Sequence, residues 1–71
     1  MSKRELKNFG KKVRALRLEK GLTQEELAEK IGVSTNYVGM VERAERNTSL
    51  LKVFKIAKAL DVKTSELFIL N

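Results

Sequence analysis

Apolar residues recur at three- and four-residue steps along nearly the whole chain, and proline is absent. This period is that of an α-helix with one buried face. In the first segment the apolar stripe consists of Leu6, Phe9, Val13 and Leu16. Gly21 follows it and is suited to the left-handed conformation that ends a helix. The pattern therefore predicts a first helix over about residues 3–20.

A second, shorter helix is predicted directly afterwards. Thr23 and Glu26 have the spacing of a capping box, in which each side chain accepts the other residue's backbone N–H. Leu27, Ala28 and Ile31 continue the apolar face. Gly32 then ends the helix after about eight residues.

A third helix follows without a loop, because Ser34 is an N-cap candidate only two residues after Gly32. Val38 and Val41 face the expected core. The opposite side at helical spacing carries Thr35, Asn36, Gly39 and Met40. We expect these small and polar residues to be exposed.

Two more helices complete the predicted fold. A polar loop, 44–49, offers two N-cap candidates and leads into a helix with the inward residues Leu50, Val53, Ile56, Ala57 and Leu60. After a turn at 61–63, Thr64 can cap a last helix of about 64–70. No segment has the pattern of a strand, and a chain of 71 residues can enclose only one core. The prediction is an all-α, compact five-helix domain over residues 1–71.

The charge distribution favours a polyanionic partner. The chain has 15 basic and 9 acidic side chains, a formal charge of +6. Residues 1–20 carry +6, residues 21–45 carry −3 and residues 46–71 carry +3. Basic segments therefore flank an acidic middle, which suits nucleic acid, although many basic surfaces have no specific ligand.

Composition argues against several other classes of function. Cysteine and histidine are absent, so no disulfide, thiolate metal site or imidazole base can form. We therefore expect no enzyme activity, no metal, no cofactor and no small-molecule ligand. No apolar run reaches the ~18 residues of a membrane span, and the N-terminus is charged. The expected location is the cytoplasm.

Residues 23–43 form the pattern of a helix-turn-helix, two short helices joined by a glycine-containing turn. In this motif the second helix is free to enter the major groove of DNA. Spacing alone leaves open an ordinary αα-corner in a helical domain.

Residues 17–28 (RLEKGLTQEELA), 31–34 (IGVS) and 41–43 (VER) resemble the lambda-repressor/Cro (XRE-like) family of helix-turn-helix regulators. The resemblance covers nearly the whole chain, and residues 42–50 look most like restriction-modification controller proteins. It implies five helices, a bacterial or phage origin, a dimer and a palindromic operator. Phage or plasmid repressors and antitoxin-type interaction modules are the alternatives. Ala44 stands where the family usually has glycine, and Thr48 where it often has proline.

The same resemblance implies roles for individual residues. Base readout falls to Thr35, Asn36, Gly39 and Met40, with Asn36 suited to the N6 and N7 atoms of adenine. Phosphate contacts fall to Arg17, Gln24, Ser34, Tyr37, Arg43, Arg46, Asn47 and Lys52. For Tyr37 the sequence leaves open whether the hydroxyl contacts phosphate or the ring packs on the protein. Arg17 and Glu42 are expected to form a salt bridge between the first and third helices.

Apolar residues left over from the core stripes predict a homodimer. They are Leu51, Phe54, Phe68, Ile69 and Leu70. Four consecutive apolar residues at 67–70 cannot all point inward from one helix. We therefore expect the C-terminal helix to contribute to dimerisation, with Phe68 also a candidate for the monomer core.

Overall fold

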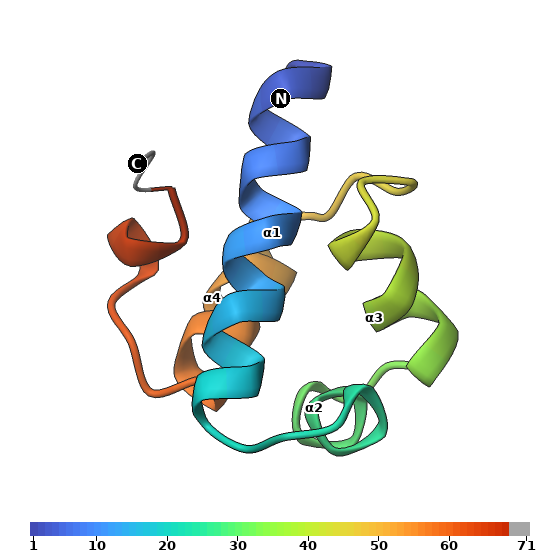
Figure 1. Ribbon diagram of the computed structural model, residues 1–71, viewed down its shortest axis with the longest axis vertical. Helices are drawn as coiled ribbons and strands as arrows, with labels where there is room; N and C mark the ends of the chain where they lie inside the picture. Colours follow the sequence, from blue (N-terminus) through green and yellow to red (C-terminus); the bar gives the residue numbers. More distant parts are fainter. Residues whose placement is uncertain (69–71) are drawn as a thin grey trace.

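The structure, a computed structural model, describes residues 1–68. Its elements are α1 (Lys3–Glu19), α2 (Gln24–Ile31), α3 (Thr35–Glu42), α4 (Leu50–Ala59) and the 3₁₀ helix η1 (Thr64–Phe68). Figure 1 shows α1 as a long central helix, with α2 and α3 on one side of it, η1 on the other and α4 behind. No strand occurs in this part of the chain, and the all-α prediction is confirmed for it.

Every α-helix begins at a hydroxyl side chain. Ser2, Thr23, Ser34 and Ser49 each accept the backbone N–H three residues later. Thr23 and Ser34 were predicted, and Ser49 is the one of the two candidates before α4 that caps it. At α2 the capping box is complete, and hydrogen bonding to the backbone N–H and the hydroxyl of Thr23 lowers the pKa of Glu26. These interactions span only three residues, which is why the sequence reveals them.

Every α-helix is followed, within two residues, by a residue in the left-handed conformation, with a positive φ. Their φ values are 72° at Gly21, 73° at Gly32, 60° at Ala44 and 56° at Asp61. In each case the next residue's N–H bonds back to a carbonyl of the last turn, as from Glu45 to Met40 at 2.8 Å. Two of these ends were predicted from glycine, whereas Ala44 and Asp61 adopt the same turn with a side chain present.

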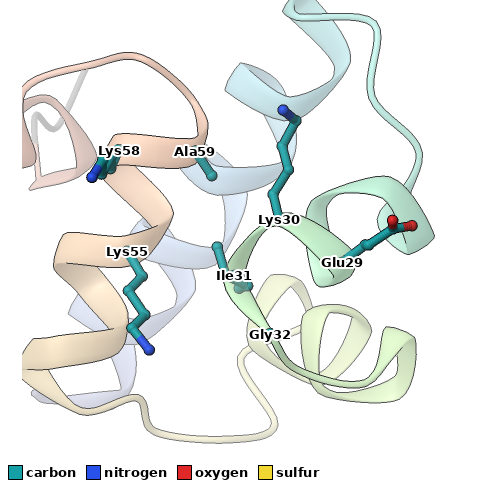
Figure 2. Close-up of a pocket in the computed structure, with 7 residues that line it drawn as sticks. All are labelled: Glu29, Lys30, Ile31, Gly32, Lys55, Lys58 and Ala59. Carbon is teal, nitrogen blue, oxygen red and sulfur yellow. The ribbon is translucent and has the colours of Figure 1, made fainter.

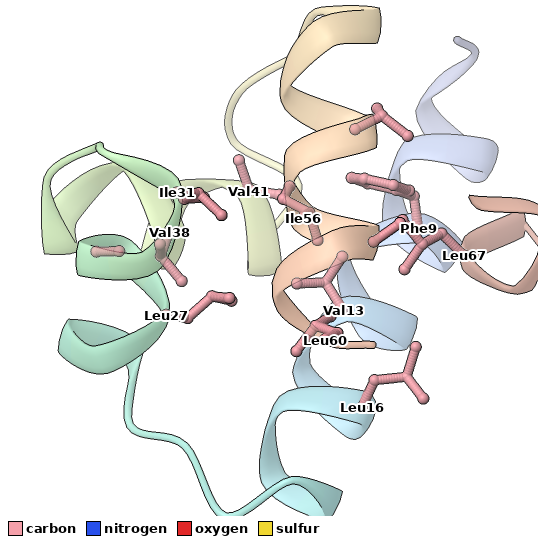
Figure 3. Close-up of a cluster of buried hydrophobic side chains, with 13 residues drawn as sticks. Phe9, Val13, Leu16, Leu27, Ile31, Val38, Val41, Ile56, Leu60 and Leu67 are labelled. Atoms are coloured by element: carbon pink, nitrogen blue, oxygen red, sulfur yellow. The ribbon is translucent and has the colours of Figure 1, made fainter. Parts of the chain in front are cut away.

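The predicted apolar stripes converge in one core (Figure 3). Its largest fully buried side chains are Phe9, Val13, Leu27, Val41, Ile56, Leu60 and Leu67. Leu50 was wrongly predicted to face inward, since it is 67% exposed. It is the first residue of α4, immediately after the Ser49 cap, and the inward face starts one turn later at Val53.

Helix α1 crosses the end of α3 at a glycine that the sequence analysis did not single out. A Cβ atom added to Gly10 would lie 2.5 Å from the carbonyl oxygen of Val41 and 2.7 Å from that of Glu42. Both contacts are shorter than van der Waals packing allows, and both are to backbone atoms. Gly10 therefore lets the two helices approach closely. In the sequence, the sign of such a close approach is a glycine in the middle of a predicted helix, where no turn requires it.

The fifth element differs from the predicted α-helix of about 64–70. In the described part of the chain it is the 3₁₀ helix η1, with the Glu66 N–H bonded to the Lys63 carbonyl at 2.9 Å. Three residues per turn place Thr64 and Leu67 on the same side, and Leu67 is fully buried. The predicted dimer residues Ile69 and Leu70 lie outside the described residues.

Candidate nucleic-acid interface

The first turn of α3 presents two polar side chains to solvent. Ser34 caps the helix by accepting the Tyr37 N–H at 3.0 Å. Thr35 and Asn36, the next two residues, are exposed. The turn is thus fixed by its cap, while the two side chains predicted to read bases are free to meet a ligand.

Farther along α3 the predicted exposure is only partly correct. Gly39 was expected on the open side but is buried, because the Arg43 guanidinium lies over it. A Cβ at position 39 would be 2.9 Å from Nη1 of Arg43. Met40 is half-buried. The open part of α3 is therefore its first turn.

The other end of α3 is fastened by a buried ion pair. Arg17 of α1 donates from Nε to Oε2 of Glu42 at 2.7 Å and from Nη2 to Oε1 at 3.1 Å. Its Nη1 donates to the Leu22 carbonyl at 2.8 Å. The two side chains are 8% and 2% exposed. Removing either partner would leave the other charge buried and unpaired, which carries a large desolvation penalty.

Gln24 joins this network from the start of α2. Its Nε2 donates to Oε1 of Glu42 at 3.0 Å. The glutamine predicted to contact a phosphate is therefore held in place by the same carboxylate that binds Arg17. An amide nitrogen has two hydrogens, so one stays available to a ligand.

Tyr37 connects α3 to the loop that follows it. Its hydroxyl lies 2.8 Å from the Thr48 hydroxyl, and its ring packs against the core. The Arg46 guanidinium lies 5.2 Å from the ring centroid and the Lys52 ammonium 6.0 Å from it. The ring thus packs on the protein, and a phosphate contact by the hydroxyl stays a prediction. Thr48 was not predicted as its partner.

The loop between α3 and α4 carries exposed basic and polar side chains. Arg43, Arg46 and Asn47, all predicted to contact phosphate, are exposed, and Lys52 is half-buried. Arg43 pairs with Glu45 at 3.2 Å, with side chains more than half exposed. Such a pair contributes little to stability.

A shallow groove lies elsewhere, between the end of α2 and α4. Figure 2 shows the residues that line it: Glu29, Lys30, Ile31, Gly32, Lys55, Lys58 and Ala59. The amino groups of Lys30, Lys55 and Lys58 point in different directions. They therefore do not converge on a common ligand.

Exposed apolar side chains gather on one side of α4. Leu50, Leu51 and Phe54 are 67%, 63% and 49% exposed. Phe68 is 44% exposed and stacks on Phe9, with ring centroids 5.4 Å apart. Phe68 therefore contributes both to the core and to the surface.

Residues 1–68 lack two other kinds of feature, a metal site and a membrane span. No group of three or more carboxylates is placed to hold a metal ion. None of the helices in this range combines the length and the apolar character needed to cross a bilayer.

Comparison with known proteins extends the resemblance seen in the sequence. The chain is similar in structure to the restriction-modification controller protein C.AhdI from Aeromonas hydrophila, with a TM-score of 0.89 and 49% identity. The match covers 92% of this chain and 98% of that one. The control protein C.BamHI from Bacillus amyloliquefaciens is 43% identical over 60 residues, 83% of this chain and 74% of its own length.

A third relative comes from an archaeon. The uncharacterized helix-turn-helix-type transcriptional regulator MJ0272 from Methanocaldococcus jannaschii is 44% identical over 64 residues, 90% of this chain and 92% of its own length. The helix-turn-helix family HTH_3 matches residues 13–67. With the exposed first turn of α3 and the buried link at its other end, these matches confirm the predicted family: the chain belongs to the XRE-like helix-turn-helix family HTH_3 of DNA-binding transcription regulators.

Proposed function

We propose that this protein is a sequence-specific transcriptional regulator that binds a pseudo-palindromic DNA operator as a homodimer. The observation that carries the proposal is the pair of exposed polar side chains, Thr35 and Asn36, on a helix whose other end is locked to α1. A rigid helix with a free polar turn is suited to the major groove. The helix-turn-helix of about 23–43 supplies this element within a single domain of residues 1–71.

Base readout is assigned to the side chains that reach outward from α3. The Asn36 amide can form a bidentate pair with adenine, in which its oxygen accepts from the N6 amino group and its nitrogen donates to N7. The Thr35 methyl group suits the methyl group of thymine. We place Met40 at the edge of the proposed contact between α3 and the bases. Gly39 would come into contact only if the Arg43 side chain moves aside, since that side chain covers it.

Phosphate contacts are assigned to residues around the first turn and the following loop. These are Gln24, Ser34, Tyr37, Arg43, Arg46, Asn47 and Lys52. All three guanidinium nitrogens of Arg17 donate within the protein. We therefore assign Arg17 to the salt bridge with Glu42 and not to a phosphate contact. Arg46→Ala should weaken binding to all DNA sequences alike and reduce the slope of log K against log salt by about one. An unchanged slope would remove Arg46 from the interface.

Dimerisation is assigned to the apolar surface formed by Leu51, Phe54 and Phe68, with Ile69 and Leu70 as further predicted members. Covering an exposed apolar patch is favourable, and a two-fold axis would place two copies of α3 about 34 Å apart, one turn of DNA. Leu51→Glu should give a folded monomer in sedimentation. Leu18→Glu is the matched control, since Leu18 is also exposed but lies on α1. A dimer that survives Leu51→Glu would place the interface elsewhere.

The decisive experiment is the selection of bound duplexes from a pool of random DNA. We expect one recurring site with two related halves whose centres lie about 10 bp apart or a multiple of this. Recovery of unrelated sequences would refute specificity, and a single unpaired half would refute the two-fold arrangement.

The similarity to C.AhdI and C.BamHI supports a narrower role as the control protein of a restriction-modification system. A phage or plasmid repressor is the alternative. A reporter gene placed downstream of the selected site distinguishes activation from repression. A controller protein should alter expression of an adjacent restriction gene, whereas a phage repressor should act on phage promoters.

A further inference from the structure

Helix α1 carries five exposed cations outside the contacts proposed above. They are Lys3, Arg4, Lys7, Lys11 and Arg14, which we call the basic flank. None of the five takes part in an ion pair within residues 1–68. No ion pair among the described residues therefore accounts for these charges.

Helical spacing puts all five on the same side of α1. At about 100° per residue they fall in a sector roughly 100° wide, next to the buried face. The acidic residues Glu5 and Glu19 and the remaining lysine, Lys12, fall on the opposite side of the helix. The basic flank is thus a stripe of one sign rather than a mixed surface.

Contacts of α1 show which way the basic flank faces. Gly10 and Arg17 lie at the edge of the buried face that borders the basic flank, and both contact the end of α3. Phe9, on the other side, stacks against Phe68 of η1. The flank therefore lies beside α3, and Figure 1 shows the chain leaving α3 at the level of the middle of α1.

We propose that the basic flank binds the backbone of duplex DNA outside the half-site contacted by α3. This inference rests on the proposed function. From Lys3 to Arg14 the helix rises about 16 Å, which corresponds to about five phosphates of one strand. Five cations over that length match the charge of such a segment, and the loop after α3 adds the exposed Arg43 and Arg46.

The test compares two triple variants that each lower the formal charge by three, from +6 to +3. The flank variant is Lys7→Gln/Lys11→Gln/Arg14→Gln. The control is Lys12→Gln/Lys55→Gln/Lys58→Gln, which removes cations on the other side of α1 and in the α2–α4 groove. Thermal melting checks that both variants are folded.

Binding is measured on mixed-sequence duplex DNA of about four helical turns, over a range of salt concentrations. We expect the flank variant to lose two to three units of the slope of log K against log salt, since each phosphate contact contributes about 0.9. At 0.1 M salt its affinity should fall on the order of 10- to 100-fold. The control variant should keep nearly the wild-type slope.

A second measurement uses the selected site with and without about 10 bp of added duplex at each end. The wild type should bind the extended duplex more tightly, and the flank variant should lose that gain. Equal slopes for the two variants would overturn the inference while leaving the proposed function intact. Loss of binding to anionic vesicles without a difference on DNA would also overturn it, assigning the flank to lipid. A wild-type protein that binds no DNA would refute both.

Discussion

The two ends of α3 are built in opposite ways. At its first turn the Ser34 cap fixes the backbone and Tyr37 packs on the core. Thr35 and Asn36 extend into solvent. At its last turn Val41 and Glu42 are buried, with the backbone against Gly10 and the Glu42 carboxylate bound by Arg17 and Gln24. The protein thus separates the part of the helix that is held from the part that is available to a ligand.

This difference shows how a helix of eight residues can be both rigid and accessible. A helix this short has little stability of its own. Anchoring at the last turn fixes its direction, and Thr35 and Asn36 at the other end stay exposed. Substitutions at the last turn should therefore affect folding, and those of Thr35 and Asn36 should affect binding alone.

The largest effect should come from breaking the anchor. Glu42→Ala leaves the buried Arg17 guanidinium without its partner, and we expect a loss of about 3–5 kcal/mol in the free energy of unfolding. Chemical denaturation measures it. Glu45→Ala is the control, since it removes the exposed pair with Arg43 and should cost less than about 1 kcal/mol. Similar losses in the two variants would mean that the buried pair does not anchor α3.

The second prediction concerns a methyl group added where α1 and α3 pack closely. Gly10→Ala should destabilise the protein by about 1–3 kcal/mol, because the new methyl group meets two backbone carbonyls. The sign of the change in the free energy of unfolding is informative, because a glycine-to-alanine substitution inside a helix ordinarily stabilises a protein by about 1 kcal/mol. Ala15→Gly, on the exposed side of α1, calibrates that ordinary difference. A more stable Gly10→Ala protein would show that the crossing is not tight.

At the free end the expected change is in binding. Asn36→Ala should weaken the selected DNA site by about 1–3 kcal/mol and leave mixed-sequence binding and the melting temperature nearly unchanged. Fluorescence anisotropy with both duplexes provides the comparison. An equal loss on both would reassign Asn36 to the DNA backbone, and a lower melting temperature would contradict the division between the ends of α3.

The smallest effect concerns the turn just beyond the anchored end. Ala44 has φ of 60°, a conformation that costs an L-residue about 1 kcal/mol and glycine almost nothing. Ala44→Gly should therefore raise the unfolding free energy by up to about 1 kcal/mol, seen as a rise of a few degrees in the melting temperature. Asp61→Gly should give a smaller gain, because aspartate tolerates this conformation better. No gain at Ala44 would show that the turn is not strained.

Features set by neighbours a few residues apart were predictable from the sequence. The caps at Thr23 and Ser34 and the ends at Gly21 and Gly32 all depend on hydrogen bonds within one turn. The apolar stripes were also predictable, because a helix repeats its buried face at a fixed period.

Features set by distant contacts were not predictable in the same way. Nothing near Gly10 in the sequence shows that α3 lies against it, and nothing near Gly39 shows that Arg43 covers it. The bond from Gln24 to Glu42 joins residues 18 positions apart. The loop from 44 and the turn at 61–63 were predicted, but the positive φ of Ala44 and Asp61 was not, because neither residue type requires that conformation.

The connection between α2 and α3 consists of Gly32, Val33 and Ser34, which end one helix and cap the next. Since only Val33 separates the end of α2 from the cap of α3, the connection also limits the rotation of α3 about its own axis. One inserted residue that is taken up into α3 would shift its residues by about 100° and direct Thr35 and Asn36 away from their present side. The length of the turn therefore sets the orientation of α3 relative to α2. We expect this length to tolerate no change, even where the residue types can vary.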